Sequence, residues 1–126
     1  MKSNKKPSNK QFDKKISETL LEFASPILEL KPDDTPDNEI EGMLIYAVTV
    51  WNALVFREIK NDDHYLSEIR KRMSVSPVVE SIVEELIKRK ETLFKDDYRL
   101  IGDFKVSHEN GQLNLWAEAR DPYTLP

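Results

Sequence analysis

The sequence predicts an α+β fold: about four helices around a buried central helix, followed by a C-terminal antiparallel β-hairpin. Three observations support this prediction. Residues 40–56 are apolar on every side of a helix, residues 77–94 carry an apolar stripe at helical spacing, and residues 103–120 alternate around Asn110-Gly111. Because the helical segments come first and the strands last, the pattern argues against an alternating α/β fold.

The length and composition limit the possible classes of protein. A chain of 126 residues fits one domain and can bury a core without disulfides. We expect residues 1–8 to be a disordered basic tail and residues 9–126 to form a single α+β domain. The absence of cysteine excludes disulfides, thiolate metal sites and thiol nucleophiles, and two histidines argue against a histidine cluster. We therefore expect no metal and no cofactor.

Charge is distributed unevenly along the chain. Residues 1–15 contain six lysines and one aspartate, a charge of +5, so the remaining residues carry −9 of the total of −4. An acidic body is a poor electrostatic match for nucleic acid. This leaves only lysines of the tail as candidate nucleic-acid contacts: Lys2, Lys5, Lys6 and Lys10.

No segment of the sequence predicts a membrane span or a secretory signal. The longest uncharged run, residues 42–56, has 15 residues, short of the roughly 18–20 that a span needs. No apolar segment follows the basic start, as a signal peptide would require. We therefore expect a cytoplasmic protein that makes no membrane contact.

The first helix is expected to begin after Ser8, which resembles a capping box with Gln11. Apolar residues then recur on one helical face: Phe12, Ile16, Leu20 and Phe23. Pro26 predicts a break in this helix, because proline removes a hydrogen bond to the preceding turn. A short further turn should reach Lys31.

The second helix, about residues 36–59, is the centre of the prediction. Thr35 is the expected N-cap, with Pro36 at the first helical position. One face carries Ile40, Met43, Leu44, Ala47, Trp51, Leu54 and Val55. The opposite face carries Gly42, Ile45, Tyr46, Thr49, Ala53 and Phe56. A helix that is apolar all round needs neighbours on both sides, from its own chain or from a second copy.

The small residues of this helix predict a dimer interface. Gly42, Thr49 and Ala53 lie within a narrow arc, where another helix could cross closely. Asn52 lies between the two faces and needs hydrogen-bond partners when buried, either a loop backbone or its copy in a dimer. The candidate interface of a homodimer is therefore Gly42, Thr49, Asn52 and Ala53.

Two more helices precede the strands. The third should start near Asn61 or Asp62 with a thin apolar stripe, and the aspartates there are interpreted as helix caps rather than metal ligands beside His64. The fourth should run from Ser76, as N-cap, to about Phe94. The stripe of the third helix is Leu66, Ile69 and Met73, and that of the fourth is Val79, Ile82, Val83, Leu86, Leu93 and Phe94.

Lys90 lies inside the apolar stripe of the fourth helix. A lysine at such a position usually extends its amine to solvent. If the hairpin folds back over this helix, Lys90 could instead pair with a carboxylate. The candidate partners are Asp97, Asp103 and Glu118.

The hairpin is expected over residues 99–107 and 112–119. Its pairing should run outward from the turn, from Glu109 opposite Gln112 to Asp103 opposite Glu118. One face must pack on the helices, because an isolated hairpin is marginally stable. The residues of that face are Phe104, Val106, Leu113, Leu115 and Ala117.

The other face of the hairpin combines charged residues with a tryptophan. Its four charges should form a checkerboard of surface ion pairs, each worth about 0–1 kcal/mol. The alternative is that Asp103 and Glu118 act as an acid/base pair, as in glycosidases. An exposed tryptophan can mark a binding surface, and the alternatives are that Trp116 stacks on Lys105 or lies under the N-terminal segment. The candidate partner-binding residues are Trp116, Lys105, Asp103, Glu118 and Arg120.

These observations favour a small, non-enzymatic accessory or regulatory protein that acts through protein–protein interaction. The alternative is a nucleic-acid-associated regulator that uses its lysine tail, and the third hypothesis is a hydrolase that uses Asp103 and Glu118.

Overall fold

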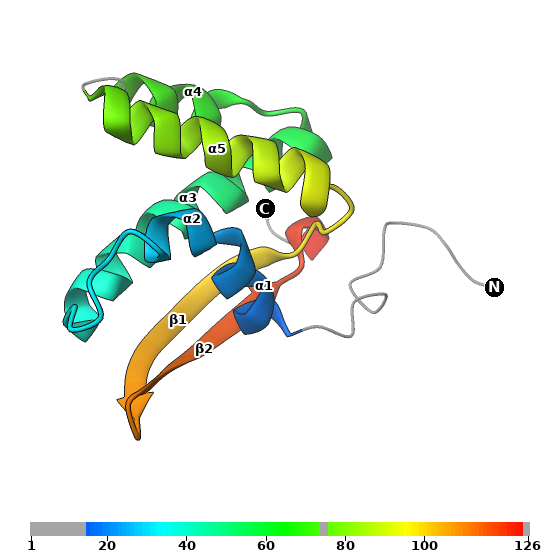
Figure 1. The fold of residues 1–126 in the computed structure, drawn as a ribbon. Coiled ribbons are helices and arrows are strands. Elements are labelled where there is room, and N and C mark those ends of the chain that lie inside the picture. The colour runs from blue at the N-terminus through cyan, green and yellow to red at the C-terminus, as the bar shows by residue number, and fades with distance from the viewer. Residues whose placement is uncertain (1–14, 74–75, 125–126) are drawn as a thin grey trace.

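The computed structural model describes residues 15–73 and 76–124 and has the predicted α+β architecture (Figure 1). Five helices precede one two-stranded antiparallel sheet within these residues. In chain order the elements are α1 (Ile16–Phe23), α2 (Ser25–Leu28), α3 (Asp37–Lys60), α4 (His64–Met73), α5 (Pro77–Leu93), β1 (Leu100–Glu109), β2 (Gln112–Arg120) and a short 3-10 helix (Pro122–Thr124). Helices α4 and α5 lie at one end of the molecule and the tip of the hairpin lies at the other.

The first helix is divided as predicted. Helix α1 ends at Phe23, and α2 starts at Ser25 with Pro26 in its first turn. Ile16, Leu20 and Phe23 are buried, whereas Phe12 and the proposed cap at Ser8 lie outside the described residues. Two backbone carbonyls at the end of α1, of Glu22 and Phe23, accept hydrogen bonds from Arg89 of α5 (2.6 and 3.3 Å).

Helix α3 starts one residue later than predicted, and Thr35 is not its N-cap. The Thr35 hydroxyl donates to the carbonyl oxygen of Pro32 (2.6 Å), so it is turned away from the helix. Pro36 is the N-cap instead, and its carbonyl oxygen accepts the N–H groups of Glu39 and Ile40. Asn61 ends the helix in the left-handed conformation (φ 53°).

The chain covers α3 on one side more completely than on the other. Residues buried along the helix are Ile40, Leu44, Ala47, Val50, Trp51, Ala53, Leu54 and Val55. On the opposite face, Ile45 and Tyr46 remain 55% and 50% exposed. In the described part of the chain, α3 is also the one helix long and apolar enough to cross a membrane by length and composition, and 44% of its most apolar window is buried in the fold.

Helices α4 and α5 begin near the predicted positions, but the stripe of α5 differs at its end. The Asp62 carboxylate accepts the backbone N–H of His64 (3.0 Å), as expected for a helix start, and Ser76 is the N-cap of α5. Leu93, predicted within the stripe, is 63% exposed, whereas Lys90 is buried. The reason is that Phe94 turns inward after the last helical turn and joins an edge-to-face aromatic cluster with Phe23 and Trp51.

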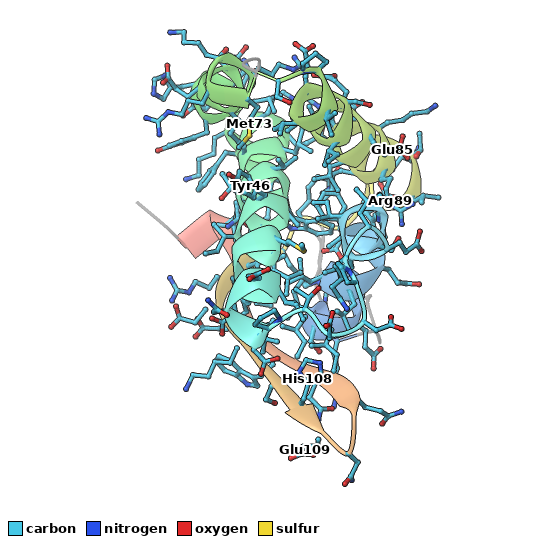
Figure 2. All side chains as sticks on the ribbon, turned by 60° about the vertical axis from the view of Figure 1, so that its left-hand side comes forward. Tyr46, Met73, Glu85, Arg89, His108 and Glu109 are labelled. Carbon is cyan, nitrogen blue, oxygen red and sulfur yellow. The ribbon has the colours of Figure 1, made fainter. Side chains whose placement is uncertain are left out.

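The turn and most of the register of the hairpin are confirmed. Asn110 and Gly111 both have positive φ (53° and 79°), as the predicted two-residue turn requires. Pairing runs as expected from Glu109 opposite Gln112 to Phe104 opposite Ala117. The apolar face of the hairpin packs on the core: α1 contacts β2, and α3 contacts β1. At the tip, the His108 ring contacts the Asp37 carboxylate at the start of α3 (Figure 2).

Beyond Phe104 the predicted register is wrong by one residue. Ile101 pairs with Ala119 and Leu100 with Arg120, so a β-bulge sets Gly102 and Asp103 together opposite Glu118. The bulge sets Ile101 on the same face as Phe104, since their partners Ala119 and Ala117 are two residues apart. Ile101 is therefore buried in the core, and the preceding Leu100 is buried as well.

Candidate functional site

The outer face of the hairpin, defined here as Asp103, Lys105, Trp116, Glu118 and Arg120, is the surface that the sequence singled out. The structure keeps all five residues on one end of the sheet, where four are exposed and Glu118 is half-buried. Trp116 is 54% exposed and lies directly opposite Lys105. A large aromatic side chain is therefore presented to solvent among charged groups.

The predicted checkerboard of charges is only half formed. Arg120 donates to one Glu118 oxygen from Nε and Nη2 (3.0 and 2.9 Å), and the Asp103 N–H donates to the same oxygen (3.4 Å). Within residues 15–73 and 76–124, the side chains of Asp103 and Lys105 form no ion pair. Asp103 lies in the bulge, out of its predicted one-to-one alignment with Glu118, whereas Lys105 keeps its predicted place opposite Trp116.

Electrostatics at Glu118 suit only one of the two carboxyl roles that the hydrolase alternative needs, the ionised one. The hydrogen bond from Arg120, followed by that from the Asp103 backbone, lowers the pKa of the Glu118 carboxyl group below its ordinary value. A glycosidase needs one carboxylic acid with a raised pKa to protonate the leaving group. The described part of the chain also holds no group of three or more His, Asp or Glu residues able to bind a metal ion.

A second surface, the α3–α4 groove, was indicated only in part by the sequence. It has a volume of about 570 Å³ and lies between the second half of α3 and the facing side of α4. Its apolar lining includes Phe56, Tyr65 and Met73, and the rings of Phe56 and Tyr65 are 5.3 Å apart. Thr49, Asn52 and Ala53, three residues of the candidate dimer interface, also line it. The signal that could have located the groove is the arc of small residues on α3.

The four candidate dimer residues occupy different environments. Asn52 bonds the backbone of Ile101 in β1, a strand and not the loop expected, and Ala53 is only 2% exposed. Thr49 is exposed, with its hydroxyl donating to the Ile45 carbonyl (2.7 Å). A Cβ added to Gly42 would meet nothing within 4 Å. The homodimer stays a prediction, with Gly42 and Thr49 as its open positions.

Lys90 neither reaches solvent nor binds the hairpin. It is 2% exposed, its Nζ donates to the carbonyl oxygen of Phe94 (2.8 Å), and it lies 4.8 Å from the Trp51 ring. Burial lowers the pKa of Lys90 to about 8, and attraction to Asp97 opposes that shift. Of the three predicted carboxylate partners, only Asp97 is near enough to act on the amine.

Sequence reasoning missed a buried ion pair between Asp97 and Arg99. Arg99 donates from Nη2 and Nε to the two carboxylate oxygens of Asp97 (2.5 and 2.9 Å), and Nη2 also donates to the Thr19 hydroxyl on α1 (3.1 Å). The Arg99 carbonyl oxygen accepts the indole N–H of Trp51 (2.6 Å). These contacts join α1, α3 and the start of β1, so the pair is structural.

Comparison with known proteins does not assign the chain to a class. No family model, no curated protein and no solved structure matches it. The candidate nucleic-acid contacts Lys2, Lys5, Lys6 and Lys10 lie outside the described residues.

Proposed function

We propose that this chain is a small, non-enzymatic protein that acts by binding another protein through the outer face of the hairpin. The observation that carries the proposal is the exposure of Trp116 (54%) at the centre of this face. Tryptophan is among the residues that contribute most to protein–protein binding energy. An indole held in solvent on a rigid strand is already in place to enter a partner's pocket.

The residues around Trp116 indicate the chemistry of the partner surface. The indole ring requires an apolar pocket, and the flanking charges require polar groups at the rim of the contact. Within the described residues, neither the Lys105 amine nor the Asp103 carboxylate forms an ion pair, so both charges are available to a partner. The Glu118–Arg120 pair, by contrast, is already satisfied within the chain. The partner should therefore present an anion for Lys105 beside the pocket for Trp116.

Affinity capture followed by direct titration tests the proposal. The full chain and its Trp116→Ala variant are used to capture partners from the native cell extract, and each captured protein is then purified and titrated by calorimetry. We expect Trp116→Ala to weaken the complex by about tenfold or more, the effect of losing a binding hot spot. Trp116→Phe should retain part of the affinity. Val78→Ala is the matched control, because Val78 is 67% exposed on α5.

Two results would contradict the proposal. One is a partner that binds wild type and Trp116→Ala with equal affinity. The other is capture of nucleic acid with an affinity that falls steeply with salt and is lost on deletion of residues 1–15, which would favour the lysine tail.

A further inference from the structure

We propose that a second copy of this chain docks antiparallel on the open face of α3, so that Ile45 and Tyr46 of each copy enter the α3–α4 groove of the other. The inference concerns a different surface from the outer face of the hairpin and does not depend on the proposed function. It identifies both the contact residues and the occupant of the groove.

The exposed side chains of Ile45 and Tyr46 adjoin the α3–α4 groove on one surface. Ile45 and Tyr46 are half exposed on the first half of α3, and the groove starts one turn later at Thr49. Figure 2 labels Tyr46 on α3 and Met73, which lines the groove, at the end of α4. In a two-fold dimer both copies use the same patch. The protruding side chains must therefore lie on one side of the axis and the groove that receives them on the other. An axis near Thr49 meets this requirement.

Gly42 lies on the same face of α3 as Tyr46. Glycine within a helix costs roughly 0.5–1 kcal/mol relative to alanine. Nothing in the described chain lies within 4 Å of a Cβ built at this position, so packing inside one copy does not explain the glycine. Gly42 lies one turn before Tyr46 on the same face, where a second helix crossing the surface would gain from the close approach of two backbones.

The charges along α3 are complementary between two antiparallel copies. The first half of α3 carries Asp37, Glu39 and Glu41, and no lysine or arginine occurs in this helix before Arg57. The last turn of α3 carries Arg57 and Lys60. An antiparallel arrangement about an axis near Thr49 sets the acidic start of α3 in one copy beside the basic end of α3 in the other. Such complementarity fixes the orientation of a complex.

A small molecule is a less complete occupant than a second copy. The groove is lined by apolar side chains and has the volume of a ligand site. A ligand within it would, however, leave Ile45 and Tyr46 in solvent beside it. A second copy covers both the groove and these two side chains, and it also uses Gly42.

Sedimentation equilibrium of the full chain over a wide concentration range tests the inference. We expect wild type to approach twice the chain mass of 14.7 kDa. Tyr46→Lys should weaken the dimer by about tenfold or more, because tyrosine is a frequent hot-spot residue. Leu93→Lys is the matched control. Leu93 is exposed on α5, away from the proposed interface, so this variant should dimerise as wild type does. Circular dichroism at low concentration checks that each variant is folded.

Gly42→Ala separates a role in the dimer from a role in folding. At low concentration, where the chain is monomeric, this variant should raise the unfolding midpoint, because alanine favours the helix. At high concentration it should weaken the dimer. A monomeric wild type at the highest attainable concentration would overturn the inference, whether or not Trp116 proves to bind a partner. So would a dimer that Tyr46→Lys leaves intact, or a monomer that binds phosphatidylcholine vesicles through Tyr46.

Discussion

Asn52, in the middle of α3, binds both backbone groups of Ile101 at the start of β1. Its Nδ2 donates to the Ile101 carbonyl oxygen and its Oδ1 accepts the Ile101 N–H, each at 2.9 Å. The side-chain amide of Asn52 thus supplies the donor and the acceptor that the backbone of a neighbouring strand would supply. The bulge lies immediately after this residue, between Ile101 and Phe104. Helix α3 therefore holds the base of the hairpin at the point where the register changes.

Substitution of Asn52 should destabilise the fold through these two hydrogen bonds. Asn52→Leu keeps a similar volume but leaves the Ile101 N–H and carbonyl without partners, which should cost about 1–3 kcal/mol. Asn52→Asp should cost a similar amount at neutral pH, because a carboxylate oxygen then faces the Ile101 carbonyl. Urea denaturation followed by circular dichroism measures both free energies of unfolding.

The pH dependence of Asn52→Asp identifies the cause. Below about pH 4 the introduced carboxyl group is protonated and can donate to Ile101 again, so the deficit relative to wild type should shrink. The deficit of Asn52→Leu should not change over the same range. Equal behaviour of the two variants would show that packing, and not hydrogen bonding, is the main contribution of Asn52.

Lys90 should make stability rise with pH in the alkaline range. Its pKa is 10.5 in an ordinary environment and about 8 in the fold, so between these values the unfolded chain binds a proton that the folded chain does not. Stability must then increase as pH rises from about 8 to 10.5, by roughly 3 kcal/mol in total. The measurement is the difference in free energy of unfolding between wild type and Lys90→Met, which should grow by about this amount.

Two controls accompany the Lys90 experiment. Burial raises the pKa of Tyr98, 5.9 Å from the amine, so Tyr98 lowers stability above pH 10 in both proteins and largely cancels in the difference. Lys88→Met removes an exposed lysine of the same helix and should leave the pH profile as in wild type. A constant difference between wild type and Lys90→Met would mean that the buried amine keeps its ordinary pKa.

The elements of the fold were predictable because their signals are local. The spacing of apolar residues located α1, α3 and α5, and Asn110-Gly111 located the turn and most of the register. The register change was not predictable, because it lies beside a contact between Asn52 and Ile101, which are 49 residues apart. The exposure of Leu93 was missed because helical periodicity does not contain the tertiary packing of Phe94 on Trp51.

The candidate surfaces show the same division. Alternation along the strands correctly placed Trp116 opposite Lys105 on one face, because this pairing follows from the position of the turn alone. The groove needs the angle between α3 and α4, and the sequence gives only its small residues. Arg99 was predicted only as the first residue of the hairpin, because its contact with Thr19 joins residues that are 80 positions apart.

The two glycines of the hairpin should respond differently to alanine. A Cβ on Gly102 would lie 2.5 Å from Glu118 Oε1 and Arg120 Nε, and both groups can move because they end flexible side chains. Gly102→Ala should therefore separate this ion pair and raise the pKa of Glu118 toward its ordinary value, as measured by NMR titration. Gly111→Ala should leave that pKa unchanged and weaken the turn, since Gly111 has a φ of 79°. An unchanged pKa in Gly102→Ala would contradict the geometry of the bulge.

The buried pair Asp97–Arg99 should be far more sensitive than an exposed pair. Asp97→Asn removes the carboxylate from an arginine that is 5% exposed, and breaking a buried pair in this way costs about 3–5 kcal/mol. Glu84→Gln breaks the pair between Arg70 and Glu84, whose side chains are half exposed, and should cost at most about 1 kcal/mol. Urea denaturation of both variants gives the comparison. Similar costs would mean that water reaches Arg99 and that α1, α3 and β1 are not held together through it.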